Sequence, residues 1–163
     1  VWLGVPREQI FAVDMEYDQL SGPWWRYWEH PGGRNPRAQY MDIEANPLTM
    51  MGGKNQIVAR IRAAYPGRVL MVGDGLSDME VQYDVDLFVG FGGAAFRQRI
   101  ADESPVYIHT LTLAPILPLA LGQLGNTSQT ALLWADGLQR IYTDEVTFRN
   151  PETRAAFLHA LKR

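Results

Sequence analysis

Two aspartates and a lysine are the residues of this sequence whose types and spacing could support chemistry. Asp74 lies in the stretch Val69–Val81, VLMVGDGLSDMEV, where an apolar run ends on two glycines that flank the carboxylate. Asp78 follows one helical turn later, and Lys54 follows a Gly-Gly pair at the start of an earlier segment of helical periodicity. Two carboxylates suit a hard cation such as Mg²⁺, and a lysine can offset the charge of a phosphoryl group.

The segments around these residues alternate between strand and helix patterns, which predicts an α/β fold with a parallel sheet covered by helices. The expected strands are Ile10–Val13, Val69–Val72, Asp86–Gly93 and Val106–Thr110. The expected helices are Gly53–Tyr65, Ser77–Gln82, Ala94–Glu103, Pro115–Leu124, Thr127–Tyr142 and Asn150–Arg163. In such sheets ligands bind beyond the carboxyl ends of the strands, and Asp74 stands at one of these ends.

The glycines beside Asp74 have a predicted role in the backbone. Gly73 and Gly75 let the chain turn sharply and leave room for a ligand. Ser77 or Asp78 is the expected N-cap of the next helix, whose free N–H groups favour anions and fixed carboxylates. The GDGxxD pattern alone also fits a glycine-rich turn with helix-capping aspartates, so it leaves both interpretations open.

The composition narrows the class of protein. The 163 residues carry a formal net charge of −3, so we do not expect a general nucleic-acid-binding protein, which would be basic. Cysteine is absent, which excludes disulfides and thiolate metal sites within these residues and fits a cytoplasmic location. The longest apolar run, Leu111–Leu124, contains two prolines and is shorter than the roughly 20 residues of a membrane span, so no membrane partner is expected.

Three stretches, in this order, resemble the carboxy-terminal half of the phosphoserine phosphatase family in the haloacid dehalogenase (HAD) superfamily. They are GGKNQIV, VLMVGDGLSDMEV and DLFVGFGGAAFRQRIADESPVYI. The resemblance covers residues 3 to 113 or so and implies an HAD-like parallel sheet with helices on both faces. It also implies a Mg²⁺-dependent phosphatase that forms an aspartyl-phosphate and acts on phosphoserine or a similar small phosphomonoester.

The resemblance implies a role for each candidate site residue. Asp74 would be a Mg²⁺ ligand. Asp78 would support the metal site and position the lysine. Lys54 would bind the transferring phosphoryl group and steady the charge of the nucleophilic carboxylate. Gly73, Gly75 and Ser77 would shape the loop around the metal and the phosphate.

The family's nucleophile motif, DxDx(T/V), is absent from these residues. Asp84–Phe88, DVDLF, has the DxD spacing but follows Asp74 and lacks the final Thr or Val. Asp14 follows an apolar run, but its place in the order is also wrong. Covalent catalysis of the family's kind needs that aspartate, so we expect a fragment, without the first strand and the substrate-choosing cap, that is inactive alone. The alternative is a non-catalytic metal- or phosphate-binding protein, or a regulatory protein, of the same fold.

The expected domain organisation has two parts. Residues 1–124 would form a partial HAD-like core with a flap insertion at about 14–50. Residues 125–163 would form a helical extension, either an additional layer or the contact surface of a homo-oligomer. The tryptophans of the flap are interpreted as aromatic packing of an insertion.

Other binding motifs fit the sequence less well. Gly90–Ala95 matches the loosened dinucleotide pattern GxGxxA, but the next strand ends near His109, where an acidic residue should hold the ribose. A P-loop at MMGGKN has Asn55 where Ser or Thr is required. A calcium loop that begins at Asp74 has Val85 where the closing Glu belongs.

Overall fold

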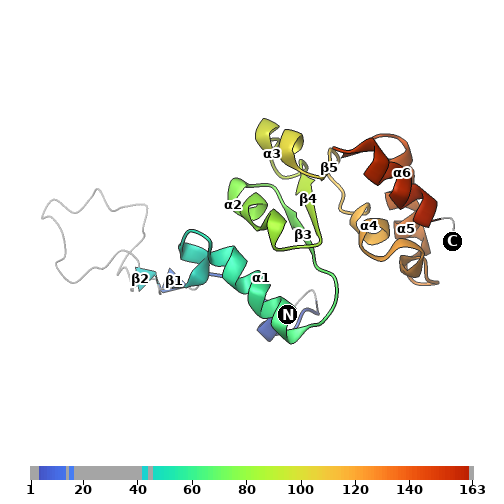
Figure 1. Ribbon diagram of the computed structural model, residues 1–163. Coiled ribbons are helices and arrows are strands. Elements are labelled where there is room, and N and C mark those ends of the chain that lie inside the picture. The colour runs from blue at the N-terminus through green and yellow to red at the C-terminus, as the bar shows by residue number, and fades with distance from the viewer. Residues whose placement is uncertain (1–3, 14, 17–41, 44–45, 162–163) are drawn as a thin grey trace, which may run out of the picture. The chain divides into compact units, whose positions relative to one another are not determined.

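A computed structural model describes most of the chain in two compact units. The described residues are 4–13, 15–16, 42–43 and 46–161. Unit 1 is Val1–Ile57 and unit 2 is Val58–Arg163, so the boundary falls inside helix α1 (Gly53–Ala64). Figure 1 shows the elements of each unit. The division at residue 124 that the sequence suggested stays a prediction.

Unit 1 contains short elements. η1 (Arg7–Gln9) and η3 (Pro47–Thr49) are single 3-10 turns. β1 (Met15–Glu16) pairs antiparallel with β2 (Asp42–Ile43). The flap expected at about 14–50 stays a prediction. The flap tryptophans lie outside the described residues.

The expected strand Ile10–Val13 is wrong. These residues form irregular chain after η1, and the side chains of Ile10 and Phe11 are 48% and 45% exposed. The Ala12 carbonyl accepts a hydrogen bond from Asn46 Nδ2 at 3.0 Å instead of joining a ladder. A short apolar run becomes a buried strand only where a sheet pairs with it, and the described part of unit 1 offers only the two-residue ladder.

Unit 2 is built on a four-stranded sheet in the order β3-β4-β5-β6. β3 (Leu70–Gly73), β4 (Leu87–Phe91) and β5 (Val106–Ile108) are parallel and confirm three expected strands. β6 (Val146–Phe148) runs antiparallel to β5 and was not expected, because residues 125–163 carried helical patterns. The α/β fold class is confirmed.

The helices of unit 2 lie in the segments where helices were expected, except that one of them begins one residue before the expected start at Ser77. They are α2 (Leu76–Met79), α3 (Gln98–Glu103), α4 (Ile116–Leu121), α5 (Ala131–Tyr142) and α6 (Pro151–Ala160), while η4 (Glu80–Tyr83) continues α2 and η5 (Gly122–Gly125) continues α4. No helix in the described part of the chain combines the length and apolarity that a membrane span requires.

The helix starts differ in how well the sequence predicted them. α6 begins as expected, since Asn150 Oδ1 accepts the Glu152 N–H at 2.8 Å and a proline takes the first turn. The N-cap of α2 is Gly75, which corrects the prediction of Ser77 or Asp78. α3 begins at Gln98 instead of Ala94, because residues 92–97 form a loop.

Helices cover both faces of the sheet. Successive strand residues point to opposite faces, so each face carries its own apolar cluster. The cluster on the face toward α4, α5 and α6 contains Val89, Val106, Ile108, Ile141 and Val146. The cluster on the face toward α2 and α3 contains Met79, Phe88, Ile100 and Tyr107. Figure 1 shows α2 and α3 on one side of β3 and β4, and α4, α5 and α6 beyond β5.

The parallel strands give the sheet two distinct edges. The carboxyl edge, where β3, β4 and β5 end, holds Asp74, the loop 92–97 and His109. The amino edge, where these strands begin and β6 ends, holds Asp86 and Arg149. Asp74 therefore stands at the edge where ligands bind in parallel α/β sheets.

Candidate active site

The candidate site begins where β3 ends. Asp74 follows Gly73, the last residue of β3, and precedes Gly75, the N-cap of α2. The Asp74 side chain is 38% exposed, so its carboxylate keeps access to solvent. The turn therefore presents a carboxylate at the carboxyl edge, as the sequence pattern predicts.

Asp78 is held by the first turn of α2. Its Oδ2 accepts the Gly75 N–H at 3.1 Å, the arrangement in which the third helical residue bonds back to the N-cap main chain. The side chain lies directly over Gly73, where a Cβ would overlap the Asp78 Cβ. Gly73 is thus required because Asp78 occupies the space beside it, and the two carboxylates share one tight turn.

Ser77 and Gly75 complete this turn. Ser77 is exposed in the first turn of α2, and Gly75 is half-buried with an extended backbone. A Cβ on Gly75 would lie 3.4 Å from Asp78 Oδ2, an ordinary contact, so this glycine is less constrained than Gly73. The phosphate-binding roles of Ser77 and Gly75 stay predictions.

Lys54 lies in the first turn of α1, in unit 1. Gly53 fixes the start of this helix, because a Cβ at that position would overlap the Pro47 carbonyl of η3. Lys54 is half-buried. The two aspartates belong to unit 2, so the convergence of the Lys54 ammonium on them stays a prediction.

Arg97 is a residue of the carboxyl edge that the sequence analysis missed. It ends the loop after β4 and is the N-cap of α3, and its Nη2 lies 3.9 Å from Asp74 Oδ2. Both side chains are more than a third exposed, so the pair contributes little to stability. Loops that follow neighbouring parallel strands reach the same edge of a sheet, and this rule could have drawn attention to an arginine after the GFGG sequence.

The donor set of this edge fits part of a magnesium site. Mg²⁺ usually takes one or two protein carboxylates, several waters and the oxygens of a substrate phosphate. Asp74 and Asp78 supply two carboxylates on one turn. Among the described residues, no group of three or more acidic or histidine side chains could hold a metal ion.

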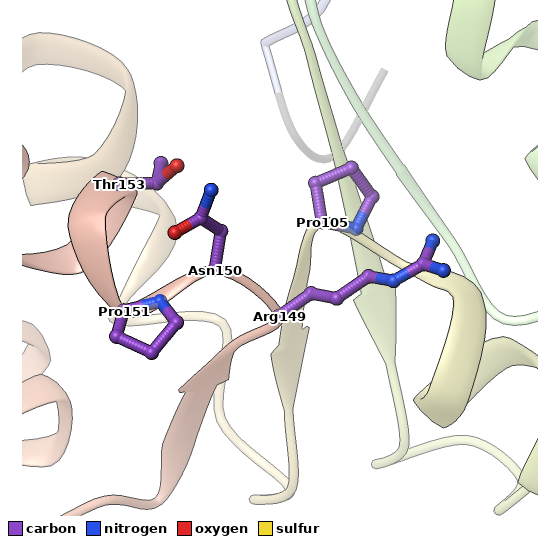
Figure 2. A pocket seen from close by; sticks show the side chains of 5 residues that line it. All are labelled: Pro105, Arg149, Asn150, Pro151 and Thr153. Carbon is purple, nitrogen blue, oxygen red and sulfur yellow. The ribbon is translucent and has the colours of Figure 1, made fainter.

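A pocket of about 460 Å³ lies at the opposite edge of the sheet. Figure 2 shows its lining residues, which are Pro105, Arg149, Asn150, Pro151 and Thr153. The Arg149 side chain extends away from Asn150 and Thr153, and its Nη1 donates to the Glu103 carbonyl at 3.2 Å. The residues that line this pocket include no carboxylate and none of the candidate site residues. The pocket is therefore separate from the candidate site at the carboxyl edge.

Comparisons with known proteins point to phosphoserine phosphatases. Over 66 residues, 40% of this chain, it is 35% identical to the human phosphoserine phosphatase and 36% identical to that of Bos taurus, and the match covers 29% of each of those proteins. The phosphoserine phosphatase of Drosophila melanogaster is 27% identical over 109 residues, 65% of this chain and 34% of that protein. The matches thus span about a third of the length of these curated relatives. No protein-family model matches the chain.

Proposed function

We propose that this chain supplies the metal-binding turn of a Mg²⁺-dependent phosphomonoester hydrolase of the HAD type. The observation that carries the proposal is the turn after β3, in which Asp78 packs over Gly73 and Asp74 faces solvent at the carboxyl edge. The similarity to phosphoserine phosphatases supports this reaction class, and phosphoserine or a similar small phosphomonoester is the proposed substrate.

The residues of the chain would divide the work. Asp74 and Asp78 would supply the carboxylates of the Mg²⁺ site, and Asp78 also keeps the turn in shape through its bond to the Gly75 N–H. Lys54 would bind the phosphoryl group, and Gly75 and Ser77 would shape the loop that holds the phosphate. A bound Mg²⁺ polarises a phosphoryl oxygen and neutralises developing charge. These 163 residues contain no DxDx(T/V) motif, so we propose that the nucleophile is not among them and that the isolated chain does not turn over.

The metal site can be tested by Mg²⁺ titration of the whole chain, followed by calorimetry and by amide NMR shifts. We expect Asp74→Asn to weaken Mg²⁺ binding about tenfold or more, because it removes an anionic ligand. Asp102→Asn is the matched control: Asp102 is an exposed carboxylate on α3 that accepts a hydrogen bond from Gln98. Equal Mg²⁺ affinity in wild type and Asp74→Asn would contradict the proposed site.

The catalytic expectation needs a separate assay. Release of inorganic phosphate from phosphoserine is measured with Mg²⁺ present, and the isolated chain is expected to show none above background. Turnover at an enzymatic rate would show that a nucleophile lies within the chain. Asp14→Asn and Asp84→Asn would then identify it, because these two aspartates lie in the stretches closest to the motif.

A non-catalytic protein of the same fold is the second candidate. The absence of the nucleophile motif from the sequence favours it. A dedicated metal- or phosphate-binding protein should bind Mg²⁺ tightly as this chain alone, whereas an enzyme part with two carboxylate ligands should bind it weakly. The Mg²⁺ titration of the wild-type chain therefore separates the two candidates.

A further inference from the structure

Tyr107 of β5 lies across two glycines of the neighbouring strand. Its register partner is Gly90, where a Cβ would lie 2.6 Å from Tyr107 Cδ2. A Cβ on Gly92 would lie 2.5 Å from the hydroxyl oxygen. The ring therefore runs along β4 toward the carboxyl edge, and its hydroxyl reaches the point where the loop 92–97 begins.

The loop 92–97 also contacts Tyr107 at its far end. The Phe96 ring meets the Tyr107 ring edge-on, with centroids 6.3 Å apart. Burial raises the pKa of the Tyr107 phenol above its ordinary value of 10.0, and the Arg97 main chain acts in the opposite direction, as a donor facing the oxygen would. Tyr107 therefore packs against both ends of the loop, at Gly92 and at Phe96.

The hydroxyl of Tyr107 is buried without a hydrogen-bond partner of full geometry among the described residues. The residue is only 1% exposed, so solvent does not satisfy it. A buried hydroxyl without a partner destabilises the fold, and phenylalanine would fill the same space without that cost. The hydroxyl is therefore better explained by a partner that it gains in another state of the site.

We propose that Tyr107 is a positioning residue for the candidate site, acting on it through the loop 92–97 and Arg97. This inference rests on the proposed function. The Arg97 guanidinium lies 3.9 Å from the Asp74 carboxylate. If Asp74 held Mg²⁺ and an anion bound beside it, the guanidinium would turn to the anion and the Arg97 N–H would donate a full hydrogen bond to the Tyr107 hydroxyl oxygen. The hydroxyl would thus stabilise the anion-bound loop more than the arrangement seen here, in which its contact with the Arg97 main chain falls short of full hydrogen-bond geometry.

The experiment compares Tyr107→Phe with wild type on the whole chain, with Mg²⁺ and inorganic phosphate as probes. We expect Mg²⁺ affinity within about twofold of wild type and phosphate affinity in saturating Mg²⁺ reduced about fivefold, the size of one neutral hydrogen bond. The urea midpoint without ligand should stay the same or rise. Tyr142→Phe is the matched control, because Tyr142 is half exposed on α5, which packs on the other face of the sheet.

Action through Arg97 is tested by a double variant. Arg97→Gln should weaken phosphate binding more than Tyr107→Phe does, and adding Tyr107→Phe to Arg97→Gln should weaken it no further. Additive losses would overturn the inference, because Tyr107 would then act independently of Arg97. A Tyr107→Phe variant with a lower urea midpoint and unchanged phosphate affinity would also overturn it, since its role would be structural.

The outcomes separate this inference from the proposed function. If wild type binds Mg²⁺ and phosphate and Tyr107→Phe binds both equally well, the inference alone is wrong. If wild type binds neither probe, the proposed function is wrong and the inference falls with it. A selective loss of phosphate affinity that disappears in the Arg97→Gln background supports both.

Discussion

The two edges of the sheet use their charged residues in different ways. At the amino edge, Asp86 Oδ2 accepts the Val69 N–H at 2.8 Å and an Arg62 N–H at 2.9 Å. Arg149 donates to the Glu103 carbonyl, and its main-chain N–H donates to the Pro105 carbonyl. These charged groups connect one element to the next, so their hydrogen bonds and ion pairs stabilise the fold.

At the carboxyl edge, Asp74 stands at an open strand end and its side chain is 38% exposed. The Asp74 carboxylate lies 3.9 Å from the Arg97 guanidinium. The tight packing there is carried by glycines, at Gly73 under Asp78 and at Gly92 against Tyr107. The comparison teaches that a carboxylate whose lone pairs are filled by main-chain donors stabilises a fold, whereas one left at an open strand end can bind a ligand.

The largest expected effect comes from Gly73→Ala at the carboxyl edge. The new methyl group would overlap the Asp78 side chain and push α2 away from β3. We expect a loss of about 3 kcal/mol in the free energy of unfolding, the upper part of the range for overpacking. Mg²⁺ binding should be lost as well, because the turn that carries Asp74 is displaced. Urea denaturation and Mg²⁺ titration measure the two effects.

Gly75→Ala is the matched control for that variant. A methyl group at Gly75 would meet Asp78 Oδ2 at an ordinary 3.4 Å, and the backbone there is extended, with φ −117°. We expect a small stability change and retained Mg²⁺ binding. Equal damage by both substitutions would mean that the turn tolerates no side chain at all, and that Asp78 packing is not the reason for Gly73.

The strands and long helices of unit 2 could be predicted from sequence because each carries a local signal. β3, β4 and β5 are apolar runs that end on glycine or polar residues, and α6 has its Asn150 cap. β6 escaped detection because it has three residues, one of them the exposed Thr147, and its pairing partner is distant in the chain. Ile10–Val13 has the same local signal as β3, but no strand of the described unit 1 pairs with it.

The sequence predicted which residues make up the candidate site, but it did not predict the contacts between them. The GDGxxD spacing located Asp74 and Asp78, since both follow one strand end. Packing of Asp78 over Gly73, and the approach of Arg97 to Asp74, depend on how the turn after β3 and the loop after β4 meet in space. Sequence spacing records neither, so these contacts needed the structure.

The next prediction compares the substitution of one aspartate at each edge by asparagine. Asp86→Asn should lower the urea midpoint, because the neutral amide is a weaker acceptor for the Val69 N–H and loses the Arg62 ion pair. Its Mg²⁺ affinity should stay at the wild-type value. Asp74→Asn should do the reverse and leave the urea midpoint close to wild type. Destabilisation by Asp74→Asn as large as that by Asp86→Asn would erase the distinction between the edges.

The contacts of Asp86 at the amino edge also predict how the stability of the fold depends on pH in the acid range. The Val69 N–H, followed by the Arg62 side chain, lowers the pKa of Asp86 below 3.8 in the folded chain. A carboxyl whose pKa is lowered by folding contributes stability above its unfolded pKa, and this contribution disappears as the pH falls through the folded pKa. Urea midpoints measured from pH 6 down to about 2.5 should therefore decline less steeply in Asp86→Asn than in wild type. A parallel decline in the two proteins would mean that Asp86 carries no such linkage.

The smallest expected effect tests whether the amino edge is independent of the site. Asn150 caps α6 beside the pocket of Figure 2, and Asn150→Ala leaves the Glu152 N–H without its acceptor, which should cost about 1 kcal/mol of unfolding free energy. Thr153→Ala changes an exposed residue of the same pocket and should cost less. Because the cap lies at the edge where strands begin, both variants should bind Mg²⁺ as wild type does. A weaker Mg²⁺ affinity in Asn150→Ala would show that stability at one edge is coupled to binding at the other, and the two edges could then no longer be treated as separate.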